Sequence, residues 1–195
     1  MISAERSAEP AMRASITVRN ATIADLSSIR DIYQYHVLNS LAAFDEIPPD
    51  LGEFEAKFSS IGERGLPFLV AQLAGEVVGY SFVTPYRGRS AHRFSVEDSI
   101  YVRQDMCGCG VGKMLLGELV NICAKLGYRQ MIAIVGNSEN IASIRLHETL
   151  GFHQVGTLQG VGFKFERWVN TVIMQRKLGE GVASLPLALP MKEVG

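Results

Sequence analysis

The stretch Cys107-Gly108-Cys109-Gly110-Val111-Gly112 decides how the rest of this chain can fold. It follows an apolar segment at 96–102 with the composition of a strand, and it leads into a segment with helical periodicity. The expected apolar stripe of that helix consists of Val111, Leu115, Leu119, Ile122 and Leu126. Glycine permits positive φ and close approach of a ligand, and a helix N-terminus offers unpaired N–H groups at the positive end of its dipole. The stretch therefore predicts a pyrophosphate-binding loop.

The glycine spacing departs from the two common nucleotide-binding motifs. A Rossmann loop needs G-x-G-x-x-G and an acidic residue at the end of the next strand. Here the next strand, expected at 128–135, ends in Gly136-Asn137-Ser138. A Walker loop needs Gly-Lys followed by Ser or Thr, whereas Lys113 is followed by Met114. A strand–helix turn that merely needs glycine is the alternative interpretation.

Length and composition favour one globular α/β domain. The chain has 195 residues, 47% of them hydrophobic, and a net charge of −1, so one core can be buried and no nucleic-acid partner is expected. No apolar run reaches the roughly 18 residues of a membrane span, and the N-terminal stretch lacks the apolar region of a signal peptide. We expect a cytoplasmic protein without a membrane partner, with a domain at 15–178 between tails at 1–14 and 179–195.

The cysteines predict free thiols. Cys107, Cys109 and Cys123 are an odd number, which favours a reducing compartment. The Cys107-x-Cys109 pair has no histidine at ligand spacing, so no metal site is expected.

Periodicity and turn residues predict a mixed α/β order of elements. Strands are expected at 16–19, 68–73, 77–84, 96–102, 128–135, 152–158 and 169–178. Helices are expected up to about 38, after a cap at Thr22 or Asp25, and at 51–60, from 111 onwards, and at 141–150. The order is therefore β-α-α-β-β-β-α-β-α-β-β.

Two adjacent acidic residues, Glu97 and Asp98, lie inside the expected strand at 96–102. Acids are depleted in strands, and a buried carboxylate is costly unless it is paired. Alternation places the two side chains on opposite faces of the strand. Because the strand leads into the glycine loop, one of them is a candidate catalytic carboxylate. The alternative is a structural role, such as an ion pair with Arg93.

Charged and polar residues on both sides of this strand are further candidates. Arg87, Arg89 and Arg93 form a cationic loop just before it, suited to bidentate capture of a carboxylate or phosphorus oxyanion, unless the loop is merely solvated. Asn140 and Ser143 share one face of the helix expected at 141–150 with His147. An N-cap role alone would explain Asn140, and the spacing leaves His147 either structural or catalytic.

Two segments resemble the signatures of the GCN5-related N-acetyltransferase superfamily. The glycine loop resembles its [QR]-x-x-G-x-[GA] motif, with Cys107 at the Gln/Arg position. Asn140-x-x-Ser143-x-x-Leu146-His147-x-x-Leu150-Gly151-Phe152 resembles its second signature. The resemblance extends over roughly residues 16–178. It is strongest to the phosphinothricin and methionine sulfone/sulfoximine acetyltransferase group, through Phe44 and the segments 86–89, 96–102 and 162–168, although Asn170 replaces a common acid.

The resemblance implies a single-domain fold with a mixed, mostly antiparallel central sheet flanked by helices. It also implies acetyl-CoA as cosubstrate, a small amino acid as acceptor and a homodimer. The residues that it implies for acetyl-CoA binding are Ile100, Tyr101, Val102, Cys107, Gly108, Cys109, Gly110, Val111, Gly112, Asn140 and Ser143. Those expected to bind the acceptor are Phe44, Arg87, Arg89 and Arg93.

Direct transfer to an amine sets the expected catalytic roles. A protonated amine must lose a proton before it can attack a thioester, and Glu97 is the candidate general base. His147 is the candidate proton donor to the leaving thiolate, and no covalent enzyme intermediate is required. Two alternatives stay open: acetylation of a protein N-terminus or lysine, and a CoA-binding module without catalysis.

Overall fold

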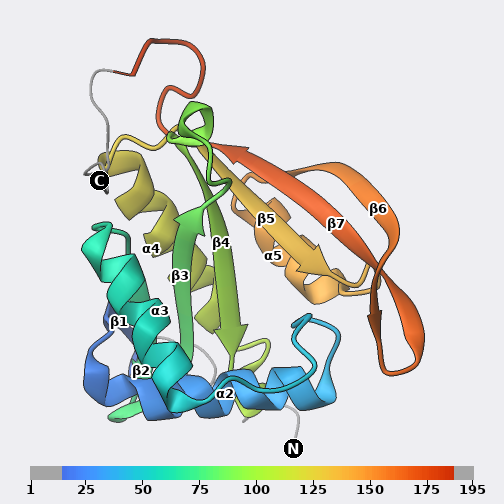
Figure 1. Cartoon of the computed structure of the whole chain (residues 1–195). Coiled ribbons are helices and arrows are strands. Elements are labelled where there is room, and N and C mark those ends of the chain that lie inside the picture. The colour runs from blue at the N-terminus through green and yellow to red at the C-terminus, as the bar shows by residue number, and fades with distance from the viewer. Residues whose placement is uncertain (1–14, 187–195) are drawn as a thin grey trace, which may run out of the picture.

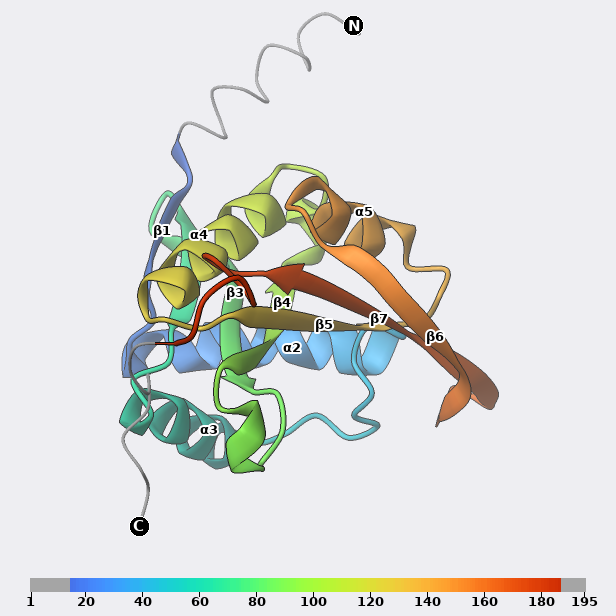
Figure 2. The same ribbon diagram turned by 90° about the horizontal axis from the view of Figure 1, so that it is seen from above.

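The computed structural model describes residues 15–186 and contains a seven-stranded sheet between two layers of helices (Figures 1 and 2). The strand order is β1-β2-β3-β4-β5-β7-β6. The strands are β1 (Thr17–Asn20), β2 (Phe68–Leu73), β3 (Glu76–Pro85), β4 (Ser95–Val102), β5 (Gln130–Gly136), β6 (His153–Lys164) and β7 (Arg167–Lys177). Neighbouring strands are antiparallel except β4 and β5, which are parallel. The expected mixed, mostly antiparallel sheet is confirmed.

Two helices cover each face of the sheet. They are α2 (Leu26–Asn39), α3 (Leu51–Glu63), α4 (Val111–Lys125) and α5 (Ile141–Thr149). Figure 2 shows α4 and α5 on one face and α2 and α3 on the other. Short 3-10 turns lie at Ile23–Asp25, Ser90–His92 and Gln104–Met106. None of the helices in residues 15–186 is long and apolar enough to cross a bilayer.

The glycine stretch forms the predicted connection from β4 to α4, but the expected apolar stripe of α4 is wrong in its second half. Val111, Leu115 and Leu119 are buried as predicted, whereas Leu126 is 39% exposed. The positions buried along α4 are Val111, Leu115, Leu116, Leu119, Val120 and Cys123. A straight helix has 3.6 residues per turn, so the face against the sheet moves to neighbouring positions toward the C-terminal end.

Strand β6 is longer than its sequence pattern suggests, because two bulges interrupt its alternation. Its register against β7 shifts between Gln154 and Gly156 and again between Leu158 and Gly162. The Asn170 side chain bridges the second irregularity: its Oδ1 accepts a hydrogen bond from Gly160 N at 2.9 Å, and its Nδ2 donates to Ser138 Oγ at 3.2 Å. A bulge breaks the period of two on which strand prediction depends.

The described part of the expected C-terminal tail packs against the domain. Arg129 donates a hydrogen bond to Ser184 Oγ at 3.1 Å and lies 3.7 Å from the Glu180 carboxylate. The expected N-terminal tail, 1–14, lies outside the described residues. The division into one domain and two tails stays a prediction.

Candidate active site

The central feature of the site is a gap in the sheet between two parallel strands. Pairing of β4 with β5 ends at Asp98 and Ala133, although both strands continue, and they diverge in Figure 1. A cavity of about 820 Å³ opens at this divergence. Its walls include Ser99, Ile100, Tyr101 and Val102 of β4 and Ala133, Ile134, Val135 and Gly136 of β5. Backbone groups that would pair inside a continuous sheet therefore face the cavity.

The glycine loop forms one end of the cavity. Gly108 and Gly110 have φ of 81° and 89°, in the left-handed region that favours glycine. No side chain caps the start of α4, and helix geometry gives the N–H groups of its first turn no partner within the helix. Gly112 fits closely against the neighbouring helix, because a methyl group there would lie 3.0 Å from Leu146 Cδ2. The loop can accept a phosphate group at the positive end of α4.

Glu97 lies where the large cavity meets a smaller one on the α2–α3 face of the sheet. The smaller cavity measures about 210 Å³, and Ser99 and Tyr101 line it together with Glu97, so this face of β4 alternates as predicted. Burial raises the pKa of Glu97, the adjacent Asp98 charge adds to the rise, and Arg87 opposes it. A partly buried carboxylate with a raised pKa between two cavities can exchange a proton with a ligand in either one.

Asp98 points to the opposite face of β4 and pairs with His147 of α5. Asp98 Oδ2 lies 3.1 Å from His147 Nε2, and the other ring nitrogen, Nδ1, lies 2.7 Å from the Ser143 carbonyl oxygen. Burial by itself would lower the pKa of His147, but the hydrogen bond and charge of Asp98 and the Ser143 carbonyl outweigh it and raise that pKa. Two acceptors around one ring favour the doubly protonated imidazolium. The possible ion pair with Arg93 does not form.

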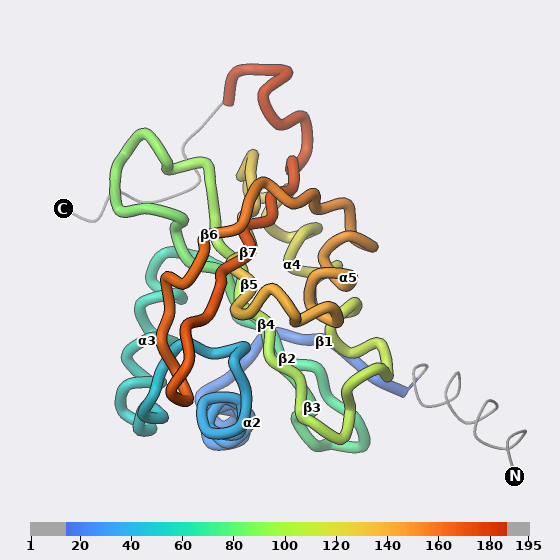
Figure 3. Tube along the Cα trace, turned by 90° about the vertical axis from the view of Figure 1, so that its right-hand side faces the viewer, coloured from blue at the N-terminus to red at the C-terminus, as the bar shows by residue number. Residues whose placement is uncertain are grey.

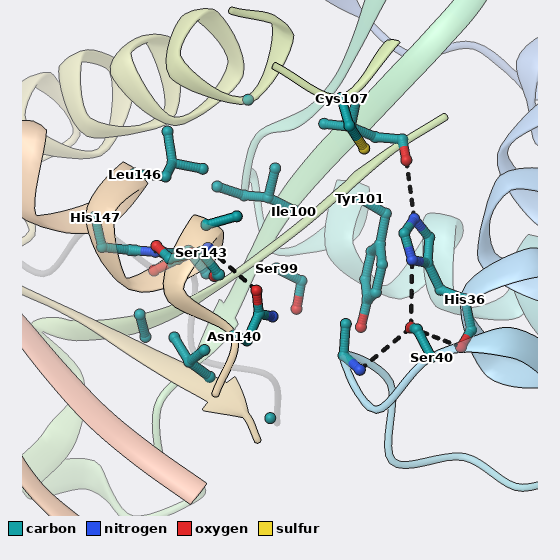
Figure 4. Close-up of a pocket in the computed structure, with 18 of the residues that line it drawn as sticks. His36, Ser40, Ser99, Ile100, Tyr101, Cys107, Asn140, Ser143, Leu146 and His147 are labelled. Carbon is teal, nitrogen blue, oxygen red and sulfur yellow. Dashed lines mark hydrogen bonds and ion pairs between the residues drawn. The ribbon is translucent and has the colours of Figure 1, made fainter. Parts of the chain in front are cut away.

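Helix α5 contributes the wall opposite α2 (Figure 4). Asn140 caps the helix, and its Oδ1 accepts a hydrogen bond from Ser143 N at 3.2 Å. The capping role anticipated from the sequence is therefore present. Asn140 and Ser143 line the large cavity with Leu146 and His147, so the second signature segment lies next to the glycine loop.

Helix α2 supplies residues that sequence analysis missed. His36 Nε2 lies 2.9 Å from the Val102 carbonyl oxygen at the end of β4, and His36 and Ser40 face the cavity in Figure 4. Burial lowers the pKa of His36, so a neutral ring that donates this bond is favoured. The Tyr33 hydroxyl donates to Asp45 Oδ2 at 2.7 Å. These contacts join segments far apart in the sequence, and no local motif marks them.

The cations around the site are placed differently from the sequence prediction. Arg87, Arg89 and Arg93 are exposed and line neither cavity. Phe44 does line the large cavity. The smaller cavity contains Lys57 of α3, whose ammonium group lies 5.2 Å from the centroid of the Phe82 ring.

The three cysteines are free thiols. Cys107 and Cys109 lie on the glycine loop, and only Cys107 lines the large cavity with Gly108, Gly110, Val111 and Gly112. Within residues 15–186, no group of three or more histidine, cysteine or acidic side chains is placed to hold a metal ion.

Known proteins share both the sequence and the fold. A protein-family model described as "Acetyltransferase (GNAT) family" matches residues 29–152. A phosphinothricin N-acetyltransferase from Alcaligenes faecalis is 47% identical over 174 residues, which cover 89% of this chain and 88% of that protein. An L-methionine sulfoximine/L-methionine sulfone acetyltransferase from Pseudomonas paraeruginosa is 41% identical over 165 residues, which cover 84% of this chain and 95% of that protein.

A solved structure agrees with the sequence comparison. It is that of a GNAT superfamily phosphinothricin acetyltransferase from Sinorhizobium meliloti in complex with AcCoA. It matches with a TM-score of 0.86 and 46% identity, and covers 88% of this chain and 93% of that one. The paired signatures, the divergent strands and these relatives agree, and the chain belongs to the acetyltransferase (GNAT) family.

Proposed function

We propose that this protein transfers the acetyl group of acetyl-CoA to the α-amine of a small amino acid of the phosphinothricin, methionine sulfoximine or methionine sulfone type. The observation that carries the proposal is the position of Glu97 between the two cavities. The large cavity has the glycine loop and the divergent strands for acetyl-CoA, and the part of it lined by Phe44, together with the smaller cavity, would accept a small amine. Relatives named for these same acceptors support the choice of substrate.

The larger cavity fits acetyl-CoA. The glycine loop, from Cys107 to Gly112, would hold the pyrophosphate chiefly through the N–H groups of Gly110, Val111 and Gly112, because the N–H of Cys109 donates to the Met106 carbonyl oxygen at 3.3 Å. The backbone of Ile100, Tyr101 and Val102 would pair with the pantetheine arm, and Asn140 and Ser143 would border it. The thioester supplies the acetyl group and a leaving thiolate.

Glu97 is the proposed general base. It takes a proton from the substrate ammonium, either directly or through a water molecule, and the freed amine then attacks the thioester carbonyl carbon. A C–N bond forms as the C–S bond breaks. The N–H groups of the divergent part of β4 would polarise that carbonyl.

His147 is the proposed proton donor to the leaving thiolate. The raised pKa of its ring supports this role, because the ring keeps its proton up to a higher pH than an ordinary histidine does. Both N–H groups, however, point to Ser143 and Asp98. Donation requires one of these bonds to open, so the contribution of His147 is smaller than that of Glu97.

Cations and one aromatic side chain are proposed to select the acceptor. Phe44 would wall its aliphatic part, and Arg87, Arg89 and Arg93 would attract its anionic groups, with Arg87 close enough to lower the pKa of Glu97. Lys57 is a second candidate for this attraction, because it lines the smaller cavity beside Glu97. An ammonium near Glu97 and an oxyanion near a cation match a dipolar amino acid.

We also propose a homodimer that works in the cytoplasm. The hairpin of the edge strand β6 and the start of β7 exposes several large apolar side chains, among them Val155, Val161, Phe163, Phe165 and Trp168, which are 51–72% exposed. Such a patch on an edge strand favours an interface. The free cysteines favour a reducing compartment.

A panel of acceptors tests the function. Purified protein is assayed for kcat/KM with phosphinothricin, methionine sulfoximine, methionine sulfone, spermidine, an aminoglycoside and an alanine-terminated peptide. The proposal expects the three amino acids to be preferred. A preference for the peptide would support the alternative of protein N-terminal acetylation, and acetyl-CoA binding without turnover of any amine would support a non-catalytic module.

A further inference from the structure

The segment 40–46, here called the acceptor loop, forms one wall of the large cavity without regular secondary structure. Ser40, Leu41, Ala42, Phe44 and Asp45 all line that cavity. In Figure 3 the loop leaves the end of α2 and passes beside the β6–β7 hairpin. A loop without its own ladder of backbone hydrogen bonds needs other contacts to keep one shape.

Lys164, at the end of β6, supplies such contacts from far along the chain. Its side chain is buried, with 2% of the residue exposed. The Nζ atom donates hydrogen bonds to the Ala43 carbonyl at 2.7 Å and to the Ser40 carbonyl at 3.1 Å, and it lies 5.0 Å from the centroid of the Phe165 ring. An ammonium group has three donors, and the two carbonyl oxygens take two of them, while the Phe165 ring adds a cation–π contact.

This arrangement is unusual for a buried lysine. Within residues 15–186, no carboxylate lies within ion-pair distance of Lys164 Nζ. Burial lowers the pKa of Lys164, and the charges of Asp45 and Glu46 oppose that shift. A buried cation is costly unless it is well hydrogen-bonded, so two loop carbonyls, rather than an acid, stabilise this one.

Phe44 fixes the same loop from its other side. Its ring lies in a slot where two strands carry glycine. A methyl group on Gly162 of β6 would lie 2.6 Å from Phe44 Cε1. One on Gly136 of β5 would lie 3.2 Å from Phe44 Cε2 and 2.5 Å from the Leu41 carbonyl oxygen. The absence of two side chains therefore makes room for the ring and for the loop backbone.

We propose that Lys164 is a positioning residue, which together with the Gly136–Gly162 slot holds the acceptor loop in the shape that binds the amino acid. The inference rests on the proposed function, because it needs this cavity to bind an acceptor. The loop ends at Asp45 and Glu46, and Asp45 bonds to Tyr33, which also lines the smaller cavity beside Glu97. The glycine loop and α5 are held by other contacts, so acetyl-CoA binding does not depend on Lys164.

The test compares Lys164→Met with Lys164→Arg, which keeps the donors, and with Arg167→Met. Arg167 is the exposed cross-strand neighbour of Lys164 and serves as the control for charge on this hairpin. Lys164→Met should raise the KM for phosphinothricin about tenfold or more, because small displacements in a site are costly. The Kd of acetyl-CoA should stay within about twofold, because its contacts are made elsewhere. Lys164→Arg should restore most of the acceptor affinity, and Arg167→Met should resemble the wild type.

Two further measurements keep the test decisive. Hydrogen exchange of the amides at 41–46 should become faster in Lys164→Met and not in Arg167→Met, and it needs no substrate. Gly162→Ala displaces the Phe44 ring while it leaves Lys164 in place, and it should raise the same KM even if Lys164→Met folds poorly.

Unchanged exchange in the acceptor loop, or an unchanged acceptor KM in both Lys164→Met and Gly162→Ala, would overturn the inference. A wild-type protein that acetylates no amino acid would instead refute the proposed function. The exchange measurement would then still decide whether Lys164 holds the loop.

Discussion

His147 and Asp98 form a buried pair in which the imidazole Nε2 lies 3.1 Å from the Asp98 carboxylate, across 49 positions of sequence. The pair connects α5, which carries one wall of the cavity, to β4, which carries Glu97. Because Glu97 is the neighbour of Asp98 in the strand, this contact also helps to fix the geometry of the proposed base.

Stability should fall with rising pH because of this pair. The pKa of His147 is raised in the folded state, so its contribution is complete below the unfolded value of about 6.5 and is lost as the pH rises through the folded value. Asp98→Asn should lower the free energy of unfolding by roughly 3 kcal/mol at pH 6 and flatten the profile. Urea unfolding between pH 5.5 and 9 measures both effects.

The matched control is Asp31→Asn, because Asp31 forms an exposed pair with Arg30 at 2.8 Å. It should change stability little at any pH. A wild-type profile that is as flat as that of Asp98→Asn would contradict the expected role of the pair.

Glu97→Gln keeps the shape of the side chain and removes the proton acceptor. The kcat should fall by about 10²–10⁴ near neutral pH, with little change in the Kd of acetyl-CoA. His147→Phe should show a smaller loss of kcat, because a thiolate can take its proton from water. Steady-state kinetics and calorimetry on the same preparations separate the two effects. If kcat falls only a few-fold in Glu97→Gln, Glu97 has a structural role and is not the general base.

The pH dependence of the rate should report the pKa of Glu97. Burial and the Asp98 charge raise this pKa, while Arg87 lowers it. A base works only when deprotonated, so the acid limb of kcat/KM should lie above the ordinary range of glutamate. Arg87→Met removes a favourable cation and should move the limb to higher pH. Arg89→Met provides the comparison, since Arg89 is not among the groups that shift this pKa, and an equal displacement there would argue against the assignment.

Gly112→Val should chiefly weaken acetyl-CoA binding. The obstacle is contact with Leu146 of α5, which a methyl group already approaches to 3.0 Å, together with a side chain at the proposed phosphate site. Calorimetry of acetyl-CoA binding measures the effect. Gly117→Ala on the same helix is the control, because nothing lies within 4 Å of its added methyl group. Equal affinities in the two folded variants would mean that the glycine loop is only a turn.

Lys57 and the arginine loop make separable predictions about the acceptor. Lys57→Met should raise the KM for phosphinothricin, which has an anionic end, about tenfold. It should raise the KM for methionine sulfone, whose sulfone is neutral, much less. Arg89→Met and Arg93→Met should show the same contrast if the arginines bind the acceptor instead. Measuring both substrates with all three variants decides which cation faces the oxyanion.

Features encoded by neighbouring residues could be predicted from the sequence. The glycine stretch predicted the β4–α4 junction, because turn geometry and helix periodicity depend on neighbouring residues only. The Asn140 cap was recognisable for the same reason. Alternation placed Glu97 and Asp98 on opposite faces of β4, although it could not name the partner of either one.

Features that depend on distant contacts could not be predicted. The contact of Lys164 with Ala43 spans 121 positions, and no periodicity marks it. Closeness in sequence is not closeness in space: Arg93 precedes Glu97 by four residues, which in an extended strand separates them by about 13 Å. The arginine loop therefore lies beyond the end of the strand pair, whereas Lys57 reaches the cavity from a helix far away in the sequence.

The divergence of β4 from β5 divides the sheet mechanically. Strands β1–β4 and β5–β7 are two plates joined by four residue pairs, from Ser95–Gln130 to Asp98–Ala133. The proposed base belongs to one plate, and α5 with its signature residues follows the other. Because the backbone of β4 would hold the pantetheine arm, the base and the thioester lie on the same plate, and the angle between the plates sets the width of the cavity between β4 and α5. Substitutions in the buried contact between β4 and β5, such as at Val96 or Met131, would change the turnover rate by changing that angle. They would alter no residue that contacts substrate.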